Sequence, residues 1–376
     1  MAESILWEAD PHTIAKHRIL QAYLEAWAPI LLQSHMGRIV YIDGFAGSGE
    51  YTNGYEGSPI IALKTIVNHA FFPKFTGDIT MLFIEIKPER AEHLEALIKT
   101  KFSNLPNKIH WEVKTGDFGT NLKTSLDGLH KEKKRLAPTF CFVDPFGWKD
   151  IDVDLLSEFM LENKAELFIT FMVGFIDRFS GDERNHKSMS KIYGKEQIDE
   201  INKQKTQEQK EETTLKLFIK NIKDTINKKG KTDRIYDLSF AAISRNNRLI
   251  YYLVYLTSHL KGLKVMKEAM FAIGKDKGSF RFNDFLDDQD PGRQGTLMDY
   301  NDVNSWQNNA GEDLYKAFEG KKTTVNEVEN YTWTDTRWIF RKGILQRLEK
   351  KNLIRYLSKR KKNALTYDDY GNLEFV

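Results

Sequence analysis

The chain has 376 residues, of which 41% are hydrophobic, 12% aromatic and 9 are proline, so it has enough apolar surface to fold and is not a disordered chain. At roughly 100–200 residues per domain, this length allows one large domain or two to three smaller ones. The single cysteine, Cys141, excludes an internal disulfide and a cysteine cage for a metal, so we expect a reducing compartment and no metal site.

Neither a membrane span nor a secretion signal is indicated. No apolar run approaches the ~18–20 residues that cross a bilayer. The start, Met1-Ala2-Glu3-Ser4, lacks a basic region followed by a hydrophobic core. We therefore expect a cytoplasmic protein that does not bind membranes.

Five short runs in the first half are rich in β-branched and aromatic residues and predict strands: 38–43 (RIVYID), 79–85 (ITMLFIE), 109–115 (IHWEVKT), 139–144 (TFCFVD) and 166–172 (ELFITFM). The stretches 58–69, 88–102, 119–134 and 150–161 have apolar residues at helical spacing. Ser58-Pro59 predicts a helix start, with the serine as N-cap and the proline in the first turn. This alternation predicts a parallel, doubly wound sheet.

The second half breaks the alternation. Residues 180–231 are dominated by Lys, Glu, Gln and Asn and predict a helical insertion, with an apolar stripe from Leu215 to Ile226. Two β-rich runs, 235–243 and 249–257, then flank a polar turn and predict an antiparallel hairpin, followed by a helix over 259–271. Five parallel strands and a terminal hairpin are typical of the Rossmann-like sheet of class I methyltransferases, so we predict such a domain over residues 1–273.

Charge gathers in the C-terminal part. Residues 321–362 hold 13 Lys and Arg against 4 Asp and Glu, a net +9, although the whole chain carries only +3. Such a block predicts contact with a polyanion, although exposed lysines on an ordinary helix give a weaker form of the same pattern.

We expect a linker or lid over 274–311 and a winged-helix domain over 312–376. Its helices are predicted at 312–318, 324–331 and 335–351, and its strands at 353–357 and 363–367. Trp338, Ile339, Leu345 and Leu348 are expected in its core. The residues predicted to contact nucleic acid are Arg337, Arg341, Lys342, Arg347, Lys359, Arg360 and Lys361. A solvated helix face is the alternative.

The glycine-rich segment 41–50 (YIDGFAGSGE) lies at the C-terminal end of the first predicted strand. In the dinucleotide fingerprint the glycines lead directly into a helix that holds a pyrophosphate, but here the helix begins only at Ser58-Pro59. S-adenosylmethionine has no pyrophosphate and suits this register better. We expect its amino-acid moiety at Asp43, Gly44, Phe45, Gly47 and Gly49, with Asp43 facing the ammonium. An ordinary tight turn is the alternative.

Two further strand ends carry acids. Glu85 ends the second strand, where it predicts hydrogen bonds to a ribose. Asp117 and Phe118 follow the third strand, where they predict contacts with an adenine. A solvated strand end for Glu85 and a helix cap for Asp117 are the alternatives. With Asp144 after the fourth strand, four acids are expected at one edge of the sheet.

Asp144-Pro145-Phe146 is similar to the (Asp/Asn/Ser)-Pro-Pro-aromatic motif of amino-group methyltransferases. In that motif the acid accepts hydrogen bonds from the target NH2 while the aromatic ring stacks on the extruded base. These three residues are therefore the predicted catalytic group. This chain lacks the second proline, which leaves the target atom open.

Longer stretches carry a closer resemblance: 16–24 (KHRILQAYL) with Trp27, 41–49, Gly57-Ser58-Pro59, 142–147 (FVDPFG) and 264–270 (KVMKEAM). Together they resemble the three-Cys-motif partner protein (TcmP) family. The resemblance implies a class I methyltransferase-like fold with a winged-helix C-terminal part and a partner protein bearing three cysteines. It does not supply a substrate. Lys16 and His17 precede an apolar helix face that either packs on the sheet or covers the cofactor.

Three functions follow from these patterns. The first is S-adenosylmethionine-dependent methylation of DNA or RNA at an exocyclic amino group. The second is a catalytically inactive, methyltransferase-like subunit that binds nucleic acid for a three-Cys-motif protein, as the missing proline suggests. A nicotinamide-dependent oxidoreductase is disfavoured by both the glycine register and the hairpin.

Overall fold

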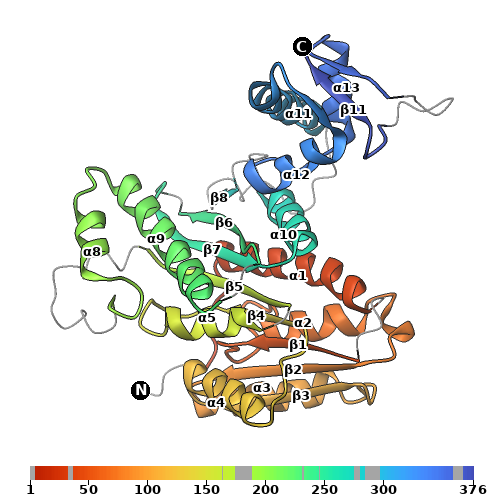
Figure 1. Ribbon diagram of the computed structural model, residues 1–376. Helices are drawn as coiled ribbons and strands as arrows, with labels where there is room; N and C mark the ends of the chain where they lie inside the picture. Colours follow the sequence, from red (N-terminus) through yellow and green to blue (C-terminus); the bar gives the residue numbers. More distant parts are fainter. Residues whose placement is uncertain are drawn as a thin grey trace. The chain divides into compact units, whose positions relative to one another are not determined.

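The computed structural model describes residues 5–32, 37–162, 164–173, 189–230, 233–244, 246–274, 280–283, 297–358 and 367–376. They divide into two compact units (Figure 1). The first comprises Met1–Ala269 with Phe282–Phe285, and the second comprises Met270–Arg281 with Leu286–Val376. None of the helices in these described ranges is long and apolar enough to cross a membrane.

One eight-stranded sheet, in the order β3-β2-β1-β4-β5-β7-β6-β8, forms the centre of the first unit. Its strands are β1 (Arg38–Asp43), β2 (Asp78–Glu85), β3 (Ile109–Thr115), β4 (Thr139–Val143), β5 (Ala165–Phe171), β6 (Tyr236–Ile243), β7 (Leu249–Thr257) and β8 (Arg281–Asn283). The first five run parallel, and β7 pairs antiparallel with both β5 and β6. The predicted Rossmann-like sheet with a terminal hairpin is therefore confirmed.

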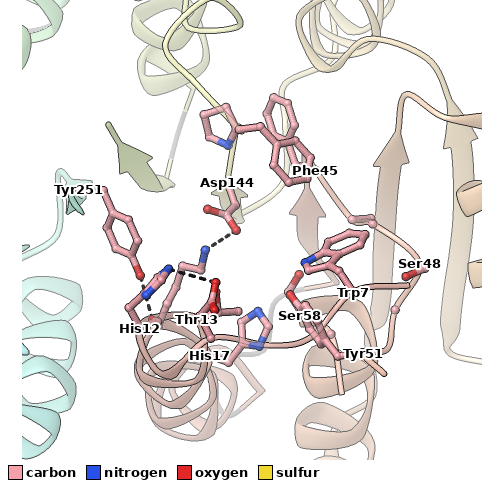
Figure 2. A pocket seen from close by; sticks show the side chains of 18 of the residues that line it. Trp7, His12, Thr13, His17, Phe45, Ser48, Tyr51, Ser58, Asp144 and Tyr251 are labelled. Carbon is pink, nitrogen blue, oxygen red and sulfur yellow. Dashed lines mark hydrogen bonds and ion pairs between the residues drawn. The ribbon is translucent and has the colours of Figure 1, made fainter. Parts of the chain in front are cut away.

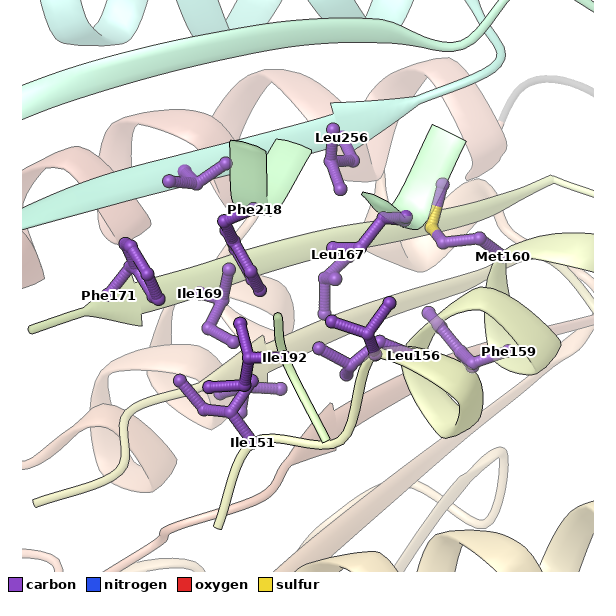
Figure 3. Close-up of a cluster of buried hydrophobic side chains, with 14 of the residues drawn as sticks. Ile151, Leu156, Phe159, Met160, Leu167, Ile169, Phe171, Ile192, Phe218 and Leu256 are labelled. Carbon is purple, nitrogen blue, oxygen red and sulfur yellow. The ribbon is translucent and has the colours of Figure 1, made fainter. Parts of the chain in front are cut away.

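The side chains of β4 and β5 alternate between two buried faces, as the twofold repeat of a strand requires. On one face, Cys141 and Phe171 join a cluster with α5 (Val153–Leu161) and α9 (Gln207–Lys228). Phe171 stacks on Phe218 of α9 with ring centroids 4.2 Å apart (Figure 3). Cys141 is fully buried in this cluster and is part of the core.

Helix α1 (Pro11–Leu32) covers the other face. Tyr23 of α1 stacks on Phe140 of β4 with ring centroids 4.9 Å apart, and Trp27 also contacts Phe140. Tyr23 and Phe140 are fully buried, so this half of α1 packs on the sheet. The beginning of α1 lies at the edge of the sheet, where it contributes to the site described below.

The predicted crossover helices are confirmed to within a few residues. They and the remaining helices of this unit are α2 (Ser58–Val67), the 3-10 helix η1 (Phe72–Lys74), α3 (Pro88–Lys101), α4 (Phe118–Lys131), α8 (Lys195–Asn202) and α10 (Leu260–Ile273), of which residues 270–273 belong to the second unit. The prediction that Ser58 is an N-cap was wrong, because Gly57 holds that position. Ser58 is the first helical residue, and its hydroxyl bonds to Asp43 instead.

The helical insertion contains α8 and α9, and residues 174–188 and 231–232 within or beside it lie outside the described residues. The predicted stripe on α9 is buried: Leu215, Leu217, Phe218, Ile222 and Ile226. Much of the predicted linker, at 275–279 and 284–296, is likewise not described, and the short strand β8 lies between those gaps.

The second unit contains α11 (Leu297–Phe318), β9 (Lys322–Thr324), α12 (Val325–Asp335), α13 (Lys342–Lys350), β10 (Ile354–Tyr356) and β11 (Asn372–Phe375). Its three strands form a sheet in the order β10-β11-β9. Thr324 caps α12 through a reciprocal hydrogen bond with Glu327. The predicted core residues Trp338, Ile339, Leu345 and Leu348 are all buried.

Three boundaries in this unit differ from the prediction. The helix predicted at 312–318 is the end of the longer α11, because Trp306, Ala310 and Leu314 continue its buried face. The helix predicted at 335–351 begins only at Lys342, since a turn before it buries Trp338 and directs its indole N–H to Asp313. β10 pairs with β11, a strand that was not predicted, and residues 363–366 of the predicted strand 363–367 lie outside the described residues.

Candidate functional site

A cavity of about 200 Å³ lies at the carboxyl edge of the sheet, between the glycine-rich segment, the beginning of α1 and the residues that follow β4. Six residues predicted from the sequence line it: Phe45, Gly47, Gly49, Asp144, Pro145 and Phe146. The other walls come from α1, α2, β7 and the N-terminal segment. In Figure 2 the Asp144 carboxylate points toward the end of α1 that carries His12 and His17.

Gly47 and Gly49 are required by the backbone of this segment. Their φ angles are +63° and +84°, which L-residues rarely adopt. The Gly49 carbonyl accepts a hydrogen bond from the Gly57 amide at 2.7 Å, which closes the loop onto the start of α2. A Cβ at Gly49 would lie 2.6 Å from Leu94 Cδ1. The loop therefore depends on both glycines.

Gly44 and Phe118 do not line the cavity. A Cβ at Gly44 would lie 2.5 Å from the Phe118 ring, so the glycine makes room for this ring behind the loop. Phe118 contacts Phe45 with ring centroids 5.6 Å apart. In this structure Gly44 therefore serves the packing that supports Phe45 in the cavity wall.

Asp43 is fully buried behind the loop and is also not part of the cavity lining. Its carboxyl accepts hydrogen bonds from the Phe45 amide at 3.3 Å and the Tyr41 hydroxyl at 3.4 Å, and from the Ser58 hydroxyl. Burial raises the pKa of Asp43 to about 7, although the hydrogen bonds from Ser58 and Phe45 oppose this shift. Since Ser58 does line the cavity, it connects Asp43 to that space.

Glu85 is buried at 3% exposure, which excludes a solvated strand end. Its carboxylate accepts hydrogen bonds from the Gly47 and Lys87 amides, both at 2.9 Å, and so ties β2 to the glycine-rich segment. Asp117 is exposed and caps α4, accepting from the Thr120 amide at 2.7 Å. The helix-cap interpretation of Asp117 therefore holds in this structure. Of the four predicted acids, only Asp144 faces the cavity.

Asp144 forms an ion pair with Lys16 of α1, with 2.5 Å between Oδ2 and Nζ. The Asp144 side chain is 22% exposed and that of Lys16 only 6%. Burial raises the pKa of Asp144, but the charge and hydrogen bond of Lys16 outweigh it and leave the pKa below its ordinary value. Lys16 Nζ also lies over the Tyr251 ring, 5.4 Å from its centroid. Asp144 is therefore an ionised carboxylate in a partly dehydrated cavity.

His17 lies next to this pair and is buried. Burial, followed by the charge of Lys16, lowers the pKa of His17 to about 3, so the imidazole is neutral near pH 7. The sequence singled out Lys16 and His17 but gave them no place in a site. Two titratable residues before the apolar face of α1 were the signal available, and only the fold brings them to Asp144.

The mouth of the cavity is aromatic. Phe146 is 63% exposed and meets the Trp7 ring edge-on at 6.2 Å between centroids. Trp7 also meets Tyr51 edge-on at 5.6 Å, and Arg90 lies over its ring at 4.5 Å. An exposed ring beside an ionised carboxylate can stack on a planar group while the carboxylate accepts its hydrogen bonds. The sequence gave no sign of Trp7 or Tyr51.

The predicted nucleic-acid residues of the second unit lie around α13. Lys342 pairs with Asp369 at 2.9 Å, and Arg347 donates to Gln307 at 3.0 Å. Arg337 stacks over the Trp338 ring at 4.5 Å, in the turn before α13, while Arg341 is exposed. The three further residues predicted, Lys359, Arg360 and Lys361, lie outside the described residues.

No protein-family model matches the chain, and no curated protein matches it. Among solved structures, Trm1 from Pyrococcus horikoshii in complex with S-adenosyl-L-methionine is 13% identical with a TM-score of 0.38; the match covers 72% of this chain and 61% of Trm1. The methyltransferase domain of bacterial CtHen1 is 12% identical with a TM-score of 0.30, over 64% of this chain and 98% of that domain. The cyclopropane synthase MmaA2 from Mycobacterium tuberculosis is 11% identical with a TM-score of 0.28, over 69% of this chain and 68% of MmaA2.

The first unit has the Rossmann-like fold of class I methyltransferases. Its strand order and the antiparallel β7 establish this fold, and the cavity lies at the carboxyl edge where open α/β sheets bind ligands. The chain spans about three fifths of Trm1, the first of the solved structures described.

Proposed function

We propose that this protein is an S-adenosylmethionine-dependent methyltransferase that acts on a nucleic acid, at an exocyclic amino group. The observation that carries the proposal is the pairing of the ionised Asp144 with the exposed Phe146 at the mouth of the cavity. An amine needs a hydrogen-bond acceptor, and a base lifted out of its stack needs an aromatic surface. Asp144 and Phe146 supply both from adjacent positions in the chain.

The residues at this cavity fit the amino-acid and methyl end of S-adenosylmethionine. At about 200 Å³, the cavity is below the ~300–1,000 Å³ of typical ligand pockets, so it would take the amino-acid and methyl end rather than the nucleoside. Backbone groups of Gly47 and Gly49 line it, and Ser58 leads to Asp43, which would hold the ammonium. When bound, the cofactor supplies a methyl group on a positively charged sulfur.

The nucleoside would extend along the same edge of the sheet. In this proposal Glu85 holds the ribose, and Asp117 with Phe118 borders the adenine. Gly44 leaves room for the Phe118 ring, and Phe45 contacts it.

The target would enter from the opposite side of the cavity. Asp144 would accept hydrogen bonds from the amino group and so orient the nitrogen lone pair toward the methyl group. Pro145 fixes the backbone between the acid and the ring, and Phe146 would stack on the base. Because the second proline of the related motif is missing here, the identity of the base is left to experiment.

For nucleic-acid binding we propose the C-terminal unit, which we interpret as a winged-helix domain beginning near residue 312. Three helices and a three-stranded sheet in this chain order support that interpretation. Arg337, Arg341, Lys342 and Arg347 would contact phosphates around α13, together with the basic segment Lys359, Arg360 and Lys361. The resemblance to the TcmP family adds the proposal of a three-Cys-motif partner protein, and the single cysteine supports the proposal of a cytoplasmic location.

A catalytically inactive nucleic-acid-binding subunit is the second candidate. The ion pair between Lys16 and Asp144 favours it, because one carboxylate oxygen is already occupied by a cation. An acid in this state has less capacity to accept from a target amine.

Methyl transfer from labelled S-adenosylmethionine to total DNA and total RNA separates the two candidates. We expect incorporation with the wild type, loss of at least about a hundredfold in Asp144→Ala, as for removal of one transition-state contact, and wild-type incorporation in the exposed control Asp127→Ala. Cofactor binding measured by calorimetry should survive in Asp144→Ala. Binding without transfer in the wild type would support the inactive candidate, and absence of binding would overturn the cofactor assignment.

A further inference from the structure

The contact between Lys16 and Asp144 joins two residues 128 positions apart. It is the ion pair at the proposed catalytic residue, and both partners line the cavity. A lysine with a side chain only 6% exposed has lost most of its water, and such a charge persists only with a partner. The pair is therefore built into the cavity wall and differs from the exposed ion pairs on the surface helices.

Burial is the largest influence on the pKa of Asp144, and Lys16 is the strongest of the groups that oppose it. Asp43 lies behind the loop on the β1 side, and because burial raises its pKa to about 7 it is uncharged in the acid range where Asp144 would take up a proton. Tyr51, directly after the glycine-rich segment, is an uncharged phenol whose pKa is raised by burial and by the charge of Asp144. His17 is neutral near pH 7. Lys16 is thus the nearby positive charge that offsets burial, with a smaller contribution from a hydrogen bond of Thr170.

We propose that Lys16 is a positioning residue for Asp144: it keeps the carboxylate ionised and turned into the cavity, so that a target amino group meets an acceptor rather than a protonated acid. This inference rests on the proposed function and deepens it. A protonated carboxyl would present an O–H donor to the N–H donors of the target, which is the wrong polarity. Tyr251, below Lys16, supports the ammonium from the β7 side.

The direction of the pH effect follows from the geometry. In the wild type, Asp144 stays charged down to pH values below its ordinary range. In Lys16→Met the attraction and the hydrogen bond of Lys16 are removed, whereas burial, the largest influence on Asp144, and the weaker hydrogen bond from Thr170 remain. The pKa of Asp144 should therefore rise above its ordinary value, and the carboxyl should accept a proton as the pH falls toward that new value.

The experiment measures the charge of Asp144 directly and the reaction separately. The titration midpoint of the carboxyl is followed by NMR of carboxyl-labelled protein, with Asp144→Asn used to assign the signal. Four proteins are compared: wild type, Lys16→Met, Lys16→Arg and Lys99→Met. Lys99 is a matched control, because it contacts Glu95 at the same 2.5 Å but is 64% exposed on α3.

We expect the midpoint to rise by at least about one pH unit in Lys16→Met, and to stay near the wild-type value in Lys16→Arg and Lys99→Met. Methyl transfer by Lys16→Met should fall about tenfold for each pH unit below the new midpoint and recover to within about threefold of wild type at pH 9. A merely structural role for Lys16 would lower transfer equally at every pH. In Lys16→Arg, methyl transfer at acid pH should stay near the wild-type level, because arginine keeps the positive charge beside Asp144.

The outcomes separate this inference from the proposed function. An unchanged midpoint and an unchanged pH profile in Lys16→Met, with transfer intact, would overturn the role of Lys16 and leave the function standing. Absence of transfer in the wild type at every pH would overturn the function, while the NMR midpoints would still decide whether Lys16 holds Asp144 ionised. If Lys16→Met fails to fold, the wild-type titration midpoint decides. A midpoint at or above the ordinary value for aspartate overturns the inference. A midpoint below that value, in both the wild type and Lys16→Arg, supports it.

Discussion

Replacing Asp43 with asparagine tests the electrostatics beneath the glycine-rich segment. Asp43 has no exposed surface, and burial raises its pKa from 3.8 to about 7. Because the folded carboxyl holds its proton more tightly than the unfolded one, its contribution to stability is full below pH 3.8 and is lost as the pH rises toward 7. Each pH unit in this window costs about 1.4 kcal/mol, so about 4 kcal/mol is lost by pH 8.

Asp43→Asn removes this loss, because an amide does not ionise. In the absence of ligand the variant should be more stable than the wild type at pH 8 by up to about 4 kcal/mol, less the cost of altered hydrogen bonds, and similar to it at pH 4. Affinity for S-adenosylmethionine should change in the opposite sense. The wild type should bind more tightly as the pH rises through 7, since the cofactor ammonium favours the charged carboxylate, whereas the variant should lose most of its affinity.

Glu166→Gln provides a matched control. Glu166 of β5 is 7% exposed, and burial raises its pKa to about 7 while hydrogen bonds from Tyr23 and Tyr255 oppose the shift. It lies at the amino end of β5, the opposite edge of the sheet from the cavity. Its amide variant should therefore gain stability at alkaline pH without any change in cofactor affinity.

Urea unfolding at pH 4, 6 and 8, followed by circular dichroism, gives the stabilities, and calorimetry at pH 6 and 8 gives the affinities. Equal pH dependence of unfolding in wild type and Asp43→Asn would show that this carboxyl is already ionised at pH 6, and the reasoning from burial would be refuted. Equal cofactor affinity in the two proteins would remove Asp43 from the proposed site.

Three other substitutions follow from single contacts. Gly49→Ala should destabilise the protein by about 1–3 kcal/mol, since it adds backbone strain at φ +84° and a clash with Leu94; urea unfolding measures the loss, and full stability would contradict the backbone geometry. Thr324→Ala removes the N-cap of α12 and should lower the free energy of unfolding by about 1 kcal/mol in the same assay. An unchanged urea midpoint would contradict a stabilising hydrogen bond between Thr324 and Glu327. Arg341→Ala should lower the slope of log affinity against log salt for nucleic acid by about one in filter-binding titrations, while Lys99→Ala leaves it unchanged; equal slopes would exclude a phosphate contact at Arg341.

Much of the fold could be predicted from local pattern. The runs RIVYID and IHWEVKT coincide with β1 and β3 residue for residue. Residues 249–257 likewise coincide with β7, because nine consecutive apolar, aromatic or β-branched positions leave no helical alternative. Errors occurred where a tertiary contact overrode the local signal. Ser58 has the chemistry of an N-cap, but the buried Asp43 takes its hydroxyl.

In the candidate site, too, local sequence signals identified some residues, whereas the roles of others depend on tertiary contacts. Asp144 and Phe146 were found because a strand end, a proline and an aromatic ring stand together in the sequence. The roles of Gly44 and Glu85 could not be derived so directly, since the first depends on the Phe118 ring behind it and the second on the amide of Gly47, 38 positions away.

What the sequence determined by itself was the set of strands and helices, the parallel sheet and the acids that follow its strands, because hydrophobic period and turn chemistry act over a few neighbouring residues. The tertiary structure decided which of those acids face a cavity and which charge each one carries. Asp43 and Asp144 are the same residue type at equivalent strand ends, yet burial raises the pKa of one, while Lys16 holds that of the other low. The pKa of a buried carboxyl group depends on how far it is removed from water and on which charged side chain lies beside it. Both conditions arise only when the chain has folded and distant segments have come together.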